Sequence, residues 1–340
     1  MQEFDMPHVP CVDHEALARH ADSTVNVPKT DAARRREQVR YLRERLEAHI
    51  AAHPDYDLVK LRGSGSTAKH TAIRRRRGEG SDADVAAYVR AGRVGGVDVN
   101  EADLLNWLLE RCKEVYGRTK VAEDFQVSDH AVGITMHGTK LKIDVVPVLY
   151  VGDADDKGYL VTRDGTRVLT SVTQHLQFIR SRRQAAGAEY LELIRLLKAF
   201  IREAKRADEQ LRCKSFLIEL IVAHLWDNGW LGQPLAVHDY PRAFEQVLAY
   251  IVHTELRTPI SFTDFYRRSA IGASSDAMQV WDPVNPANNI VSSYTEYHRG
   301  RLVEVAKAAF EEINWAALAP TKGDAVEAWR NLLGPSFGVA

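Results

Sequence analysis

The sequence predicts an α+β protein with two lobes, one over residues 1–165 and an α-helical lobe over residues 166–340. Segments 82–89 and 141–151 are mainly apolar between charged or turn residues, which is typical of buried strands in a mixed sheet. From about residue 170, apolar residues recur every three or four positions, which is typical of helices. We assign the N-terminal helices to the first lobe and consider a C-terminal helix packing back on it.

The composition is that of an ordinary globular protein, with 45% hydrophobic and 27% charged residues. A net charge of -1 argues against a protein that coats nucleic acid through its overall charge. The cysteines, Cys11, Cys112 and Cys213, are too far apart for a disulfide framework or a zinc cluster and indicate a reducing compartment. The N-terminus lacks the pattern of a signal peptide, and the most apolar run, 216–226, is too short for a bilayer. We therefore expect a cytoplasmic protein with no membrane contact.

Arginines gather at two places in the first lobe. A helix expected over about residues 31–53 exposes six arginines between residues 34 and 45. Four more stand together from Arg74 to Arg77, beside glycines. Both groups fit either a hydrated surface or a surface that binds phosphates, including those of DNA. The sequence leaves these two interpretations open.

The central feature of the first lobe is an Asp-x-Asp pair, Asp82 and Asp84, at the start of the strand expected over 82–89. Residues two apart on a strand point to the same face, so both carboxylates project side by side. Carboxylates that close repel each other unless a cation lies between them, and Mg²⁺ prefers oxygen ligands of this kind. The alternative is an ordinary strand start with two solvated acids, because so short a motif often occurs by chance.

A Gly-Ser turn, Gly65-Ser66, precedes these acids. Glycine lets the backbone approach a ligand closely, and turn amides with a hydroxyl donate hydrogen bonds to anionic oxygens. Together, the turn and the acids predict a nucleoside triphosphate held over metal ions.

A third acid, Asp144, lies in the middle of the apolar strand expected over 141–151. Burying a carboxylate alone in such a strand is strongly unfavourable, so the sequence predicts a partner for it. A metal ion shared with Asp82 and Asp84 would be such a partner. The alternative is a salt bridge to Lys140 or Lys142.

In the helical lobe, three residues fit contacts with a phosphate or a base. Lys198 lies on the apolar stripe of an expected helix, so it either extends to solvent or faces negative charge in a cleft. Ser215 lies in the first turn of a nearly all-apolar and therefore buried helix, where it would hold a phosphate, cap the helix, or do both. Its neighbour Phe216 either stacks on a base or packs in the core.

The order of these motifs resembles the polymerase-β-like nucleotidyltransferases. In chain order the motifs are Gly65-Ser66, Asp82-Ala-Asp84, Asp144-Val-Val-Pro, Lys198, Lys214-Ser215-Phe216 and Asp282-Pro-x-Asn-Pro-x-Asn288-Asn289. More narrowly, the chain resembles the group that contains the 2′-5′ oligoadenylate synthases, cGAS and the bacterial cGAS/DncV-like enzymes (CD-NTases) of CBASS anti-phage systems. Within that group it is most similar to the CdnC/CdnD-type enzymes found beside HORMA-domain partners.

The resemblance implies a nucleotidyltransferase lobe of mixed sheet and helices beside the helical lobe, with the active site in the cleft between them. It implies that Asp82, Asp84 and Asp144 are catalytic and bind two Mg²⁺ ions, with Mn²⁺ as an alternative ion. It also implies contacts to the donor nucleotide from a second set of residues: Gly65, Ser66, Lys198, Ser215, Phe216 and Asn288.

The same resemblance implies the activity. The expected enzyme joins nucleoside triphosphates, ATP first among them, into a cyclic oligonucleotide second messenger such as cyclic tri-adenylate for CBASS defence, with a HORMA-domain regulatory partner. The alternatives are a linear oligoadenylate synthase and a catalytically silent nucleotide-binding scaffold. Because all three acids are present, a catalytic role is favoured over the scaffold.

Overall fold

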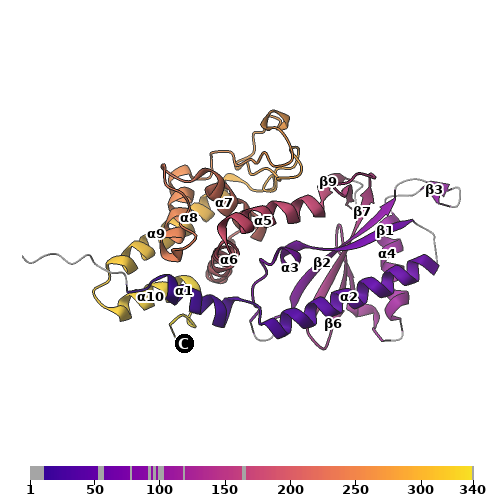
Figure 1. The fold of residues 1–340 in the computed structure, drawn as a ribbon, viewed down its shortest axis with the longest axis horizontal. Helices are drawn as coiled ribbons and strands as arrows, with labels where there is room; N and C mark the ends of the chain where they lie inside the picture. Colours follow the sequence, from indigo (N-terminus) through magenta and orange to yellow (C-terminus); the bar gives the residue numbers. More distant parts are fainter. Residues whose placement is uncertain are drawn as a thin grey trace, which may run out of the picture. The chain divides into compact units, whose positions relative to one another are not determined.

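The computed structural model describes residues 11–52, 57–76, 79–90, 93–94, 97–98, 103–117, 119–162 and 166–338. They form two compact units, one from Val27–Ser181 and one from the described parts of Met1–Asn26 and Arg182–Ala340. We call them the sheet unit and the helical unit (Figure 1). In this grouping the first N-terminal helix falls with the helical unit, and the second, Lys29–Ala52, falls with the sheet unit. The chain passes from the sheet unit to the helical unit after residue 181, whereas we expected a boundary at 165.

In the described residues, the sheet unit contains a seven-stranded sheet. Its strands are β1 (Leu58–Ser64), β2 (Ser81–Arg90), β5 (Phe125–Val127), β6 (Val132–Met136), β7 (Leu141–Tyr150), β8 (Lys157–Val161) and β9 (Arg167–Ser171). The main order is β1-β2-β7-β6-β5, and β8 joins β7 to β9. The central strands β2 and β7 run parallel, and every other pair in this sheet is antiparallel. A separate short pair is formed by β3 (Arg93–Val94) and β4 (Val97–Asp98).

One face of the sheet is covered by α2 (Lys29–Ala52) and α4 (Leu104–Tyr116), as Figure 1 shows. The core under these helices takes alternate strand residues, such as Val85 of β2 and Val145 of β7, together with Leu42 and Leu46 of α2. The arginines on the other side of α2 are exposed or half-buried, as the helical pattern predicted. In the second arginine group, Arg77 lies outside the described residues.

The opposite face of the sheet carries a second, smaller core. Ala86 and Tyr88 of β2 pack there with Val148 of β7 and Val172, the first residue of α5 (Val172–Ala186). The Tyr88 hydroxyl accepts a hydrogen bond from the Val172 amide at 3.2 Å, which fixes the start of α5 to the sheet. Because strand residues alternate, the acidic residues that precede Ala86 at spacings of two share this second face.

The helical unit is built from two N-terminal elements and the helices that follow α5. These elements are α1 (His14–His20), the π-helical turn η1 (Ala21–Val25), α6 (Glu189–Ala207), α7 (Ser215–Asn228), α8 (Tyr240–Thr254), η4 (Arg268–Ala270), α9 (Glu296–Leu318) and α10 (Lys322–Leu333). The helix α7 is buried on most of its sides, as its apolar sequence predicted. The buried guanidinium of Arg182 donates to Asp227 and to Asp264, at 3.1 and 3.0 Å, and so ties the end of α7 to a long loop.

None of the helices in the described ranges is both long enough and apolar enough to span a membrane.

Candidate active site

The parallel pairing of β2 with β7 brings two of the predicted acids together. Asp84 lies directly opposite Asp144 in the register, on neighbouring strands that are about 4.8 Å apart. Asp82 lies two residues before Asp84 and therefore on the same face. Three acids from two distant segments of the chain thus meet on one patch of the sheet, which we call the acidic patch: Asp82, Asp84 and Asp144.

Electrostatics connect the three carboxylates. The pKa of Asp84 is raised above its usual value, mainly because the carboxyl is buried and then because Asp144 and Asp82 repel its charge. Lys69 and His130 partly offset this repulsion. A bound cation would therefore stabilise the charged form of Asp84.

Two cationic side chains of the protein already contact the patch. Lys142 Nζ lies 3.2 Å from Asp144 Oδ1, so the salt bridge that we considered as an alternative is present, and its partner is Lys142. Arg75, from the loop after α3 (Gly65–Lys69), pairs with Asp82. As the side chains lie, no three His, Cys, Asp or Glu residues within the described ranges are grouped as a metal ion would require. The metal-binding role of the acids stays a prediction.

Two glycines beside the patch leave the space that the acids occupy. Gly65 adopts φ +64°, and a β-carbon at this position would overlap Asp84 Oδ2. On the other side, a β-carbon at Gly133 of β6 would lie 2.8 Å from Asp144 Oδ1. The backbone therefore approaches both carboxylates more closely than any other residue type would allow. An oxygen-rich patch with this little steric cover fits a hard divalent cation.

The Gly-Ser turn is fastened to the acidic strand. Ser66 lies in the first turn of α3, and its carbonyl accepts hydrogen bonds from the amides of Thr71 and Ala72, at 2.9 and 3.2 Å. The hydroxyl of Thr67 donates to the carbonyl of Asp82 at 3.2 Å. The turn that we predict to bind phosphate and the acids that we predict to bind metal therefore form one connected piece of the sheet unit.

The other predicted residues lie in the helical unit. Lys198 of α6 is buried and donates to Glu219 of α7 at 2.5 Å, with side chains that are 4% and 3% exposed. Sequence reasoning missed Glu219 as this partner, although an acid inside an almost wholly apolar helix was a signal. We considered two positions for the Lys198 side chain, in solvent or facing negative charge in a cleft. Because the side chain is buried, the solvent position is excluded. Its contact with a triphosphate stays a prediction.

The start of α7 is joined to the Pro/Asn-rich turn over residues 280–290, which contains Asp282 and Asn288. Lys214 precedes Ser215, and its ammonium donates to the carbonyl of Ile290 at 2.6 Å. Asn288, two residues earlier, donates its side-chain amide to the buried Asp282 at 3.1 Å. The N-cap residue of α7 is Lys214, and Ser215 is the first residue of the helix. Ser215 is exposed and Phe216 is half-buried, so their nucleotide contacts also stay predictions.

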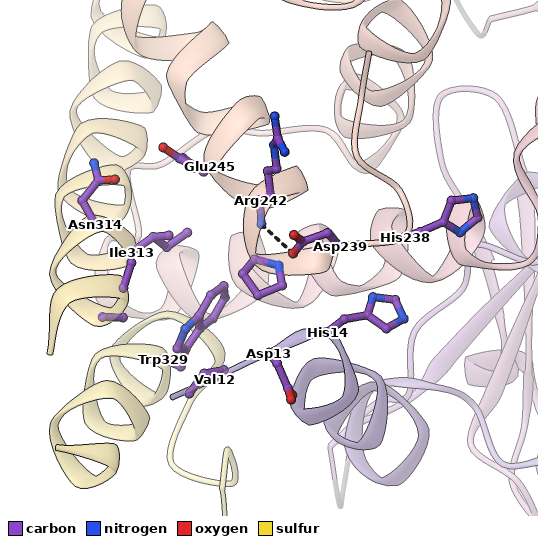
Figure 2. Close-up of a pocket in the computed structure, with 13 residues that line it drawn as sticks. Val12, Asp13, His14, His238, Asp239, Arg242, Glu245, Ile313, Asn314 and Trp329 are labelled. Atoms are coloured by element: carbon purple, nitrogen blue, oxygen red, sulfur yellow. Dashed lines mark hydrogen bonds between the residues drawn. The ribbon is translucent and has the colours of Figure 1, made fainter. Parts of the chain in front are cut away.

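A separate cavity of about 480 Å³ lies wholly within the helical unit, between the starts of α1 and α8 and the ends of α9 and α10. Figure 2 shows Trp329 and Ile313 beside it, with Asp239 bonded to the amide of Arg242. It contains none of the predicted site residues, so it does not belong to the candidate active site.

Comparisons with known proteins identify the family. No protein-family model matches the chain. The cyclic AMP-AMP-AMP synthase of Escherichia coli strain MS 115-1 is 38% identical over 327 residues, which cover 96% of this chain and 98% of the relative. A CBASS oligonucleotide cyclase, CdnC of E. coli strain KTE188, is 30% identical over 324 residues, or 94% and 96% of the two chains.

Solved structures of CD-NTases are similar to this chain as well. The structure of E. coli MS115-1 CdnC with ATP has a TM-score of 0.85 and 36% identity, and covers 96% of this chain and 99% of its own. The complex of that CdnC with HORMA-deltaN gives a TM-score of 0.84 at 37% identity, over 96% and 98% of the two chains. Vibrio cholerae DncV, at 12% identity, a TM-score of 0.69 and 95% of each chain, supports the fold alone.

The fold is that of a polymerase-β-like nucleotidyltransferase, with a mixed sheet and added helices, as predicted. The chain belongs to the bacterial cGAS/DncV-like nucleotidyltransferases (CD-NTases), in the group of the CBASS oligonucleotide cyclases. Enzymes of this family use divalent metal ions. The predicted family and enzyme class are therefore confirmed.

Proposed function

We propose that this protein makes a cyclic oligonucleotide from nucleoside triphosphates as a second messenger in CBASS anti-phage defence. ATP is the preferred substrate, and cyclic tri-adenylate is the expected product. The observation that carries the proposal is the acidic patch, in which Asp84 and Asp144 face each other across parallel strands beside the Gly65 turn. The cyclic AMP-AMP-AMP synthase that covers almost the whole chain supports the choice of product.

In this proposal the acidic patch holds two Mg²⁺ ions, with Mn²⁺ as a substitute. Bound divalent ions would lower the pKa of the attacking ribose hydroxyl and neutralise the leaving pyrophosphate. Asp144 accepts the proton of that hydroxyl as it attacks the α-phosphate of the donor. Asp82 and Asp84 would hold these ions, and the repulsion that Asp84 experiences from Asp82 and Asp144 favours a cation beside it.

The remaining predicted residues hold the donor nucleotide. Ser66 and the amides that follow Gly65 donate to phosphate oxygens. Ser215, the exposed first residue of α7, would do the same from a helix N-terminus, where amides favour an anion. Lys198 would add a positive charge, Phe216 would stack on the base, and Asn288 would donate its side-chain amide from the turn that Asp282 orders.

Product analysis tests the proposal. The purified protein is incubated with all four ribonucleoside triphosphates and Mg²⁺, with and without its HORMA-domain partner, and the products are identified by mass spectrometry. We expect an adenine-containing cyclic trinucleotide that resists both phosphatase and exonuclease. A phosphatase-sensitive ladder of products would indicate a linear oligoadenylate synthase, and no product under any condition would favour a silent scaffold.

We also propose a HORMA-domain regulatory partner, because the CdnC relative has been solved with HORMA-deltaN. The expected effect is a higher turnover in the presence of the partner, measured in the same assay. DNA contact through the arginines of α2 rests on sequence alone; a steep salt dependence of duplex binding would support it.

The first prediction concerns Asp144. Asp144→Asn keeps the size of the side chain but removes its charge and its ability to accept a proton, so product formation should fall by at least about a hundredfold. Asp155→Asn, on a turn outside the patch, is the matched control and should keep wild-type turnover. Circular dichroism checks that both variants fold. Near-normal product from a folded Asp144→Asn protein would remove the proposed catalytic role.

A further inference from the structure

We propose that Lys142 is a positioning residue for Asp144, and that its ammonium occupies the place of a divalent cation until one binds and displaces it. Lys142 would thereby set the metal concentration at which the acidic patch fills. The inference rests on the proposed function, because it assumes that the patch binds metal.

The first observation is the strand register. Lys142 lies directly opposite Asp82 on the parallel strands, two residues before the pair formed by Asp84 and Asp144. It is two residues from Asp144, so it projects from the same face of β7. Lys142 therefore lies beside the three carboxylates of the acidic patch, on the same face of the sheet.

The second observation is the contact itself. Lys142 Nζ lies 3.2 Å from Asp144 Oδ1, and the two side chains are 35% and 25% exposed. Fully extended from the strand, the lysine would carry its charge into solvent, as lysines usually do. Here it folds back along its own strand to the acid.

The third observation explains why the lysine can do so. A β-carbon at Gly133, which lies opposite Asp144 on β6, would overlap Lys142 Cε and would lie 2.8 Å from Asp144 Oδ1. Only glycine leaves room there for the lysine stem. The patch is therefore shaped for Lys142 as well as for the acids.

The charges make this contact a competitor of the metal. A divalent ion beside Asp144 would lie within a few ångströms of an ammonium, where like charges repel even in a well-screened site. Binding a cation therefore requires Lys142 to move away. Arg75 pairs with Asp82 in a similar way, from the loop after α3, with a 42% exposed side chain.

Metal binding in the absence of nucleotide tests the inference. Mn²⁺ is titrated into the purified protein and free Mn²⁺ is measured by electron paramagnetic resonance, which needs no catalytic turnover. Lys142→Met removes the competing charge while keeping the length of the stem. We expect it to bind Mn²⁺ about 3- to 10-fold more tightly than wild type, whereas Lys142→Arg stays within about twofold.

Lys140→Met is the matched control, because Lys140 is an exposed lysine two residues away, in the turn before β7. It makes the same change in net charge and should leave Mn²⁺ affinity within about twofold of wild type. Equal tightening by both variants would reduce the effect to overall charge and overturn the proposal. Unchanged or weaker Mn²⁺ binding by a folded Lys142→Met protein would also overturn it, and Lys142→Gln repeats the test with a polar side chain.

The result separates this inference from the proposed function. If wild type binds no Mn²⁺ and Asp84→Asn makes no difference, the metal-binding role of the patch has failed. If Asp84→Asn weakens Mn²⁺ binding but Lys142→Met leaves it unchanged, only the role of Lys142 has failed.

Discussion

Gly65 brings the backbone of the predicted phosphate turn directly against Asp84 of the acidic strand. Its φ of +64° is a backbone conformation that glycine adopts at little cost, and the absent side chain leaves the space that Asp84 Oδ2 fills. From the sequence, such a glycine is recognised only as a turn residue. The structure gives a second reason why glycine is required here, because the Asp84 carboxylate fills the space of a side chain.

We expect Gly65→Ala to lose both stability and activity. The left-handed backbone costs a non-glycine residue about 1 kcal/mol, and the overlap with Asp84 adds to that cost and displaces the carboxylate. Product formation should fall by more than about tenfold, because a displaced acid no longer matches its partners across the patch. Thermal melting and the product assay measure the two effects.

Gly152→Ala is the control for the backbone cost alone. Gly152 has φ +85°, and no atom lies within 4 Å of its would-be β-carbon. It should lose about 1 kcal/mol of stability and keep its activity. If Gly65→Ala behaves like Gly152→Ala in both assays, the close approach to Asp84 has no functional importance.

Among the secondary-structure elements, α6 and α7 are held together by a charged pair inside an apolar interface. Lys198 and Glu219 face each other there, and both side chains are almost fully buried. Each charge depends on the other, because an unpaired charge in such a place is strongly unfavourable. The pair therefore fixes how the two helices meet, whether or not Lys198 also binds a phosphate.

Lys198→Met should destabilise the protein by about 3 to 5 kcal/mol, because it leaves Glu219 buried without this partner. The double variant Lys198→Met/Glu219→Met should recover most of that loss, since neither charge then remains. Urea denaturation measures both changes, and Lys205→Met, at the exposed end of α6, should change stability by less than about 0.5 kcal/mol.

The same double variant separates two roles of Lys198. If the lysine contacts the donor triphosphate, the double variant stays inactive although its stability is close to that of the wild type. Recovery of product formation together with stability would restrict Lys198 to a structural role.

At the scale of the whole molecule, the two ends of the described chain meet in the helical unit. His20, at the end of α1, packs against Phe337 with ring centroids 5.1 Å apart. Its Nε2 atom is buried and has no hydrogen-bond partner within the described residues. Burial, and to a lesser degree the charge of Arg202, lowers the pKa of His20 from 6.5 to about 4.

This histidine predicts a loss of stability in mild acid. Between pH 6.5 and about 4 the unfolded chain binds a proton at His20 and the folded chain does not, so stability falls as the pH drops through this range. The shift corresponds to about 3 kcal/mol at the acid end. Urea unfolding at pH 7.5 and pH 5 measures the effect.

Replacing the imidazole with an uncharged ring provides the comparison. His20→Phe should remove most of the acid sensitivity, because no proton can then bind in the unfolded chain at this position. His253→Gln, at an exposed site in the last turn of α8, should keep it. If His20→Phe loses as much stability between pH 7.5 and 5 as the wild type, the acid sensitivity has another source.

Many of the helices and strands, and the direction of their side chains, could be predicted from the sequence, because both depend on residues close together in the chain. The alternation of residues in β2 places Asp82 and Asp84 on one face without knowledge of the fold. The apolar stripe of α2 was predicted from its spacing, and the burial of α7 from a sequence that is apolar on nearly every side. The order of motifs was specific enough to indicate the family.

Only the tertiary structure decided which distant residues are partners. The register of β7 against β2 sets Asp144 opposite Asp84 and Lys142 opposite Asp82, and no spacing within one segment contains that register. The pairing of Lys198 with Glu219 likewise depends on how α6 and α7 pack. A sequence fixes which way a side chain points from its own strand or helix, whereas its partner depends on where the rest of the chain brings the next strand or helix.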